Sequence, residues 1–296
     1  MSVTDQSEAI KRNTAKTAKP LKSALKTTKR AVQGVTAEYL ALPNFISNSK
    51  IRNDLYSELA KEYTNLNASV NDWTMNSSNA VAKEFWRYAS EDLPKGASVA
   101  TFGSFSTKYL NDIISGVNPS TVNSQVAINP NINKMLTSDL NVIRSSVTTT
   151  LAEGAVEGLT RPEMTARMKE KVIGKTGTFS FVDSGGKRWS ADNYFAMLNR
   201  SLNANVARDS YISTMTDAGY DLARIVGGVT GSSAEDPSDP CDEWAGEIIS
   251  MTGATSGYPT LEDARSAGVF HVNCVHSVTA LAPSEYKELE PDAGGK

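Results

Sequence analysis

The residues best suited to bind a metal ion all lie in the last fifth of the chain. The sequence contains two cysteines and two histidines, which are Cys241, His271, Cys274 and His276. Thiolates and imidazoles are the preferred ligands of tetrahedral zinc, and two of each complete a structural site. The long gap after Cys241 differs from common zinc-finger spacing, so the indication comes from the clustering rather than from a motif. We therefore predict a structural zinc site at these four residues.

The same residues permit other arrangements. Cys241 and Cys274 could form a disulfide, or both could be buried thiols beside hydrogen-bonded imidazoles. A cysteine with a nearby histidine is also the minimum for a thiol nucleophile, and Cys274 and His276 share one face if they lie on a strand. A thiol hydrolase is thus the enzymatic alternative, but we assign no catalytic residue. Two cysteines are too few for a disulfide-rich secreted scaffold, which favours a protein made in the cytoplasm.

Basic residues are concentrated near the N-terminus. Residues 1–30 carry eight basic and two acidic residues, or +6, while the rest carries 22 basic and 31 acidic residues, or −9, in a chain of net charge −3. Since Pro20 should interrupt a helix, we predict a flexible basic arm over residues 1–35 that contacts DNA or an acidic protein surface. The alternative is a solvated tail without a partner. The candidate nucleic-acid-binding residues are Lys11, Arg12, Lys16, Lys19, Lys22, Lys26, Lys29 and Arg30.

Apolar periodicity predicts an α+β protein whose N-terminal two thirds are mostly helical. A helical domain is expected over residues 36–150, with a polar loop at 76–79, a break at about 117–132 and a long helix at about 133–158. No run of about 18 apolar residues is found, so we expect no membrane span. The absence of an apolar stretch near the N-terminus argues against a secretory signal.

A compact α+β domain is predicted over residues 151–283, followed by a loose acidic tail at 284–296. Thr160 and Glu163 have the spacing of a capping box that begins a helix. A Gly185-Gly186 turn predicts a hairpin, and a second long helix is expected at about 191–218. Short strands should fill the remainder.

The segment from about 190 to 283 resembles the C-terminal domain of phage minor head proteins, in the Mu-F-like and minor capsid families. A C-x-x-W-x-G turn is matched by Cys241, Trp244 and Gly246, and the closing motif runs from His271 to His276. The chain departs from the family pattern at three positions. Val272 replaces a usual proline, Val275 replaces a usual arginine, and Ser238 stands where the Mu-F-like branch often has another cysteine.

This resemblance implies a minor head protein of the virion, assembled in the host cytoplasm and associated with the phage portal and capsid proteins. Roles in head assembly and in DNA packaging or ejection would follow, without catalytic activity. The functional alternative is a nucleic-acid-binding protein that acts through its basic arm, with a salt slope of roughly −5 for six neutralised phosphates. On the 191–218 helix, Arg200 and Arg208 are expected on a solvated face, or else in contact with DNA or a portal subunit.

Overall fold

The computed structural model describes residues 3–94, 97, 99, 101–102, 130–182, 186–227, 240–271, 274, 276–282 and 284–286. The chain forms two compact units, each assembled from separate stretches of sequence. Unit 1 comprises Met1–Thr17, Thr74–Pro119 and Met197–Lys296, and unit 2 comprises Ala18–Trp73 and Ser120–Ala196. The predicted α+β class is confirmed, because long helices are combined with small antiparallel sheets.

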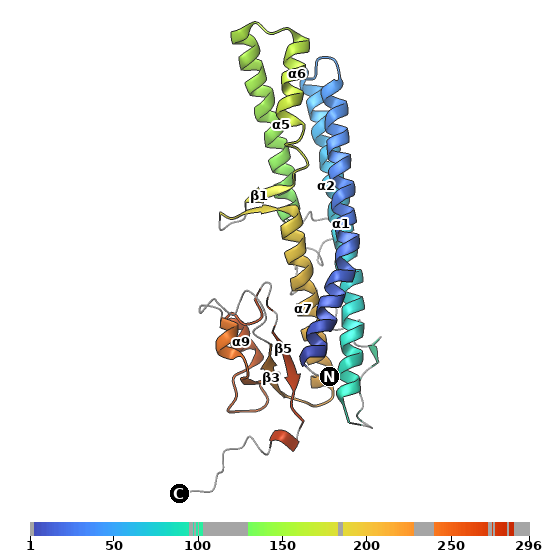
Figure 1. Ribbon diagram of the computed structural model, residues 1–296, viewed down its shortest axis with the longest axis vertical. Helices are drawn as coiled ribbons and strands as arrows, with labels where there is room; N and C mark the ends of the chain where they lie inside the picture. The colour runs from blue at the N-terminus through green and yellow to red at the C-terminus, as the bar shows by residue number, and fades with distance from the viewer. Residues whose placement is uncertain are drawn as a thin grey trace. The chain divides into compact units, whose positions relative to one another are not determined.

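Figure 1 shows the helices and strands of the chain and labels most of them. The helices are α1 (Val3–Ala41), α2 (Ser49–Asp92), α5 (Pro130–Glu157), α6 (Arg161–Val172), α7 (Ala191–Asp217), α8 (Pro240–Trp244) and α9 (Leu261–Ser266). The strands are β1 (Ser180–Val182), β2 (Arg188–Ser190), β3 (Leu222–Val226), β4 (Ile248–Ser250) and β5 (Ser277–Ala280). No helix in the described part of the chain is both long and apolar enough to span a membrane.

Unit 2 is a helical assembly with one hairpin, in which α5 and α6 lie side by side (Figure 1). As predicted, α6 begins after Thr160, whose backbone N–H donates to the Glu163 carboxylate at 2.7 Å. Strands β1 and β2 form the predicted antiparallel hairpin. Leu59, Tyr63 and Ile143 are fully buried in this unit, so aliphatic and aromatic packing stabilises it.

Asp139 places a carboxylate in the interior of unit 2, where it is 2 % exposed. It accepts hydrogen bonds from the Tyr63 hydroxyl at 2.7 Å and from the Gly177 backbone N–H at 2.8 Å. The Phe179 ring packs edge-on against Tyr63, with ring centroids 5.5 Å apart. The carboxylate thereby links α5, α2 and the loop that follows α6.

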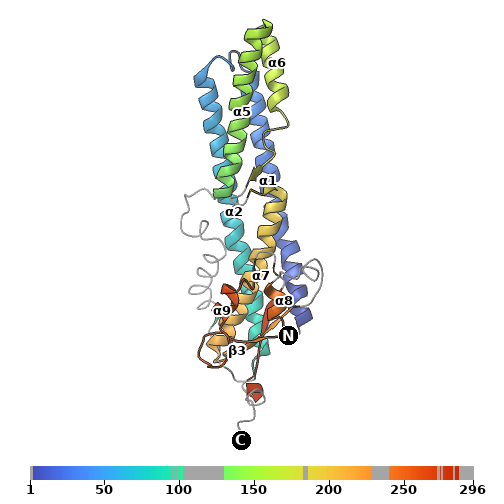
Figure 2. The ribbon, with the colours of Figure 1, turned by 90° about the vertical axis from the view of Figure 1, so that its left-hand side faces the viewer.

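Unit 1 contains a three-stranded antiparallel sheet in the order β4-β3-β5. Leu222 pairs with Ser250 on one side of β3, and Val226 pairs with Ser277 on the other. The hydrophobic core of unit 1 combines the C-terminal part of α7 with residues of the sheet, of α9 and of the loop before β5. Figure 2 shows α8 and α9 close to β3.

A loop after β4 is organised around the side chain of Asp221. This carboxylate accepts hydrogen bonds from the Ser250 hydroxyl at 2.7 Å and from the backbone N–H groups of Thr252 at 2.8 Å and Thr255 at 3.0 Å. Burial alone would raise the pKa of Asp221, but these donors outweigh it and hold the pKa well below its usual value. The carboxylate thus replaces the backbone partners that an irregular loop cannot supply.

The basic N-terminal segment is helical, contrary to the predicted flexible arm over residues 1–35. Helix α1 includes Pro20, which is exposed, and it buries Leu21, Leu25 and Val32. Burial of this apolar stripe, together with several alanines of high helix propensity, compensates for the backbone hydrogen bond that proline removes.

Two further expectations differ from the structure. The polar run at 76–79 lies within α2, because Ser77 and Ser78 are buried by tertiary packing that overrides their weak helix propensity. The expected boundary near residue 150 lies inside α5, with residues on both sides in unit 2.

The remaining expectations concern the break at 117–132 and the acidic tail. Most of the break lies outside the described residues, and α5 begins at Pro130. Of the predicted loose tail at 284–296, only residues 284–286 are described. They form a helical turn in which the Tyr286 hydroxyl accepts the backbone N–H of Leu222 at 3.0 Å.

Candidate metal centre

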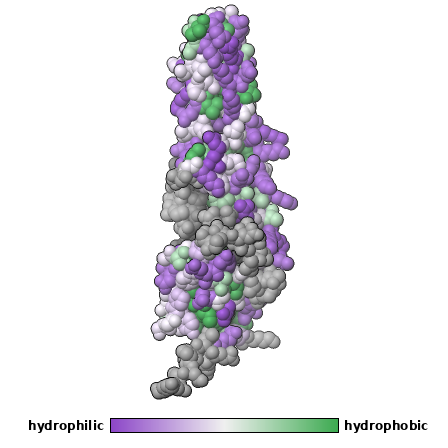
Figure 3. Space-filling model, turned by 60° about the vertical axis from the view of Figure 1, so that its left-hand side comes forward, coloured by the Kyte–Doolittle hydropathy of each residue, from purple (hydrophilic) through white to green (hydrophobic). Residues whose placement is uncertain are grey.

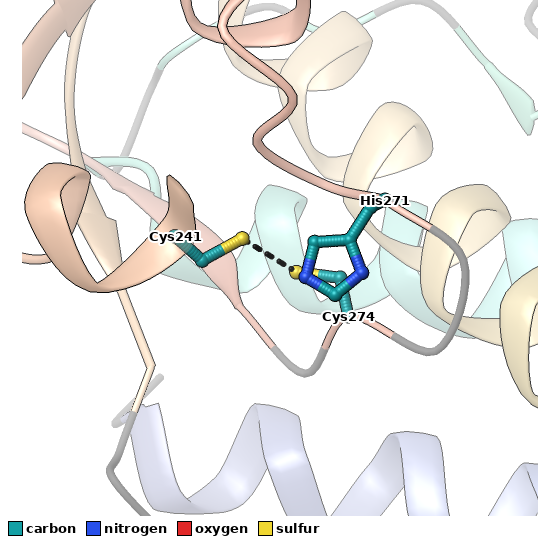
Figure 4. A group of neighbouring side chains, drawn as sticks. All are labelled: Cys241, His271 and Cys274. Carbon is teal, nitrogen blue, oxygen red and sulfur yellow. Dashed lines mark hydrogen bonds between the residues drawn. The ribbon is translucent and has the colours of Figure 1, made fainter. Parts of the chain in front are cut away.

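Three of the four predicted zinc ligands converge in unit 1. Cys241 extends from α8, whereas His271 and Cys274 come from the loop between α9 and β5, and Figure 4 shows all three side chains pointing toward one another. One ligand atom from each lies within 4.8 Å of the other two. Both cysteines are buried and His271 is exposed, so a metal ion at this site would have one ligand at the protein surface.

The separation of the sulfur atoms suits a metal better than a disulfide. The Sγ atoms of Cys241 and Cys274 are 3.4 Å apart, and both thiols are free. A disulfide requires about 2.0 Å, whereas two thiolates bound to tetrahedral zinc at about 2.3 Å lie roughly 3.8 Å apart. A small increase in the distance between the two sulfur atoms would therefore make room for the ion. Thiolates and imidazoles are also the ligands that zinc prefers.

His276, the fourth predicted ligand, lies beside this group but is not part of it. Its Nδ1 atom is 3.6 Å from the Cys274 Sγ, and its backbone N–H donates to the same sulfur at 3.3 Å. The His276 side chain is 4 % exposed. It thus contacts the Cys274 sulfur without belonging to the three-residue group.

The two thiols differ in acidity because they share a hydrogen bond. That contact and burial raise the pKa of Cys241 to about 12. The hydrogen bond from Cys241 is also the main reason that the pKa of Cys274 falls to about 7, aided by the His276 N–H and the charge of Arg208. Cys274 is therefore the thiol that first becomes a thiolate, the form that binds metal.

Arg208 holds the ligand-bearing loop from both ends. Its guanidinium lies 4.0 Å from the centre of the Phe270 ring, directly before His271, and donates to the His276 carbonyl oxygen at 3.2 Å. It also donates to the Asn205 side chain and lies 3.8 Å from the Asp209 carboxylate. Arg208 is 2 % exposed, so the expectation that it lies on a solvated face is wrong.

Sequence reasoning could not identify this role of Arg208. The position has the spacing of a helix surface residue, and only tertiary structure places Phe270 and the 270–276 loop against it. Arg200, on the same helix, is exposed as predicted.

Two glycines allow the close approaches on which the centre depends. Gly268 has a φ of 94°, and a Cβ there would lie 3.1 Å from the ring of Pro240, the neighbour of Cys241. A Cβ on Gly227 would lie 2.5 Å from the imidazole of His276. Larger side chains would displace α8 or the imidazole, so both glycines determine where the ligands lie.

The eight basic residues predicted to bind nucleic acid are all exposed on α1. Lys11, Arg12 and Lys16 belong to unit 1, and the other five belong to unit 2. Arg12 forms an ion pair with Glu84 at 2.5 Å and a hydrogen bond to the Tyr88 hydroxyl at 3.0 Å. These residues are therefore presented by a helix and do not form part of the metal centre.

Only a few large hydrophobic residues are exposed in the described part of the chain, among them Leu151, Val156 and Ile173. Figure 3 shows one face of the molecule, on which hydrophilic residues dominate and hydrophobic residues form isolated spots. Single exposed hydrophobic residues of this kind are ordinary and identify no binding site.

Comparison with known proteins supports the resemblance inferred from the sequence. Residues 144–284 match the family model described as phage minor capsid protein 2. The match begins within α5 and extends past β5, so it includes the whole candidate metal centre. No curated protein and no solved structure gives a match.

Proposed function

We propose that this chain, whose residues 144–284 match the phage minor capsid protein 2 family, is a minor structural component of the phage head. The family match is the observation that carries the proposal. Its partners would be other phage head proteins, among them the portal and the capsid proteins. Assembly in the host cytoplasm, with a role in packaging or ejecting DNA, is the finer form of this hypothesis.

A structural zinc ion in the C-terminal region is the second element of the proposal. Cys241, His271 and Cys274 would hold the ion, and His276 would complete the site. Zinc would join α8 to the loop before β5, two segments that the contact between Cys241 and Cys274 already brings together. Bound to four protein ligands, the ion would leave no position for a substrate or for a reactive water.

The thiol hydrolase alternative is less well supported. The Cys274 sulfur and the His276 imidazole are 3.6 Å apart, as a nucleophile and its base could be. However, Cys274 is 6 % exposed and His276 is 4 % exposed, and a reactive thiol requires access to its substrate. Their burial therefore favours a structural role.

Quantitative mass spectrometry of purified phage particles tests the head assignment. We expect this protein in particles at a few copies per portal ring, together with the portal and major capsid proteins. Chemical crosslinking of the same particles should then join it to the portal. Particles that contain the portal and capsid proteins but not this chain would contradict the proposal.

A further inference from the structure

We propose that the exposed face of α1 in unit 2 binds the phosphate backbone of duplex DNA without sequence preference. The binding surface, called here the basic stripe, consists of Lys19, Lys22, Lys26, Lys29 and Arg30. This activity goes beyond the proposed role in the phage head and does not depend on it.

The helix presents these five cations on one side. At about 100° per residue, they lie within an arc of about 100° and extend over about 16 Å of the helix axis. Leu21, Leu25 and Val32 are buried on another side of the helix, about 110° around its axis from the middle of the stripe, and this burial leaves the stripe facing outward. One strand of a duplex carries about five phosphates over about 16 Å, so the number of cations in the stripe matches the phosphates of a single strand.

The charge of the stripe is not compensated locally. No acidic residue occurs between Glu8 and Glu38, and no residue of the stripe forms an ion pair within the described part of the chain. By contrast, Arg12 on the same helix is paired with Glu84. The sequence stretches of unit 2 contain 17 basic and 12 acidic residues, or +5, whereas those of unit 1 contain 13 and 21, or −8.

The residues between the cations favour DNA over a protein partner. The exposed positions among them include Ser23 and Thr27, which are small hydrogen-bond donors suited to phosphate oxygens. No described residue of the stripe segment is a large exposed hydrophobic residue. A specific protein interface needs an apolar or aromatic centre, whereas contact with the DNA backbone needs only spaced cations.

The test is the binding of the full-length protein to a fluorescent duplex of arbitrary sequence, measured by anisotropy as the salt concentration is varied. Five phosphate contacts predict a slope of log K against log salt of about −4 to −5. Replacing all five residues of the stripe with Gln should weaken binding at least tenfold at low salt and bring the slope close to zero. A matched control replaces Lys50, Lys61, Arg161, Lys187 and Arg188 of unit 2 with Gln, which changes the net charge equally.

We expect the control variant to keep most of the affinity and of the salt slope. Equal losses in the two variants would overturn the proposal, because net charge rather than the stripe would then drive binding. So would failure of the wild-type protein to bind DNA at low salt, or binding only to an acidic head protein. Circular dichroism confirms that the helices of each variant persist. Particle incorporation is measured separately, so that the head assignment can stand if the stripe does not bind DNA.

Discussion

The two units differ in charge and in the residues that could bind a metal. Unit 2 carries the positive charge, contains no cysteine or histidine, and packs its helices through residues such as Leu59 and Tyr63. Unit 1 is acidic, and its small sheet lies next to both cysteine thiols and both histidine imidazoles of the chain. Long helices can bury enough apolar surface by themselves, whereas short strands and loops need additional links. A zinc ion bound as proposed would supply such a link in unit 1.

The carboxylates of Asp139 and Asp221 show a second contrast between the units. In unit 2, burial raises the pKa of Asp139 despite hydrogen bonds from Tyr63 and Gly177. In unit 1, hydrogen bonds from Thr252, Thr255 and Ser250 overcome the effect of burial and lower the pKa of Asp221. Folding therefore disfavours the ionised form of Asp139 and favours the ionised form of Asp221. The two units should therefore respond to acid in opposite directions.

Metal removal should produce the largest difference between the units. Chelation, or a Cys274→Ser substitution, should lower the stability of unit 1 by about 3 kcal/mol or more, or roughly 10 °C in melting temperature. Hydrogen exchange should show lost protection in β3 and β5, with that of α5 and α6 retained. The chelator should have no further effect on the Cys274→Ser variant. A purified protein that contains no zinc, and whose melting curve does not respond to the chelator, would refute the metal centre.

Acid should distinguish the units through Asp221 and Asp139. Because the folded pKa of Asp221 lies below its unfolded value near 4, its stabilisation is present above about pH 4 and is lost as the pH falls further. Because the folded pKa of Asp139 is raised, its contribution is present below the unfolded value and is lost as the pH rises through the folded pKa. Hydrogen exchange at a series of pH values measures both.

Variants of these carboxylates sharpen that test. We expect Asp221→Asn to cost about 2 kcal/mol at neutral pH, because charge-assisted hydrogen bonds are lost, and to remove the acid sensitivity of β3 and β4. Asp139→Asn should abolish the loss of stability of unit 2 as the pH rises. If both units lose protection together and with the same pH dependence in all variants, these carboxylates do not control the response.

Replacing Arg208, which contacts the loop that carries the ligands, should have a smaller effect than removing the metal. An Arg208→Lys substitution removes the stacking on Phe270 and weakens the bond to the His276 carbonyl, so zinc affinity should fall about tenfold. A competition assay with a colorimetric chelator measures the change. Arg200→Lys, at an exposed position of the same helix, is the matched control. Equal zinc affinities for the two variants would mean that Arg208 serves only general packing.

Two capping threonines offer the smallest and most closely matched comparison. The Thr260 hydroxyl accepts the backbone N–H of Asp263 at 3.0 Å at the start of α9, whereas the Thr160 hydroxyl at the start of α6 donates to the Glu163 carboxylate at 2.6 Å. We expect Thr260→Ala to lower the free energy of unfolding by about 1 kcal/mol and Thr160→Ala to lower it by only a few tenths of a kcal/mol. Denaturant unfolding gives both values. A larger loss for Thr160→Ala would reverse the expected order.

Sequence reasoning succeeded where a local pattern determines the structure. The helix starting after Thr160, the hairpin before Ser190 and the helix from Ala191 follow from capping, turn residues and apolar spacing. It failed where distant packing decides the outcome. The helix over Pro20 and the burial of Ser78 depend on neighbouring helices that no local pattern reveals.

The candidate centre shows the same limit. Composition alone singled out its cysteines and histidines, because few such residues occur and all lie close together. The structure brings Cys241, His271 and Cys274 together and places His276 beside them. The residues that support them, Arg208 and Gly268, belong to helix and loop positions without a distinctive signature. Their roles arise from contacts between segments far apart in the sequence.

The interleaved order of the units bears on how the chain folds during synthesis. Every residue of unit 2 has left the ribosome once Ala196 emerges, whereas unit 1 still lacks its last hundred residues. The Ser277 hydroxyl donates to the side chain of Gln6 at 2.9 Å, which joins one of the first helical turns to one of the last strands. Unit 2 can therefore fold while translation continues, but the start of α1 must wait until Ser277 has emerged. During that interval the early helix is available to chaperones and assembly partners.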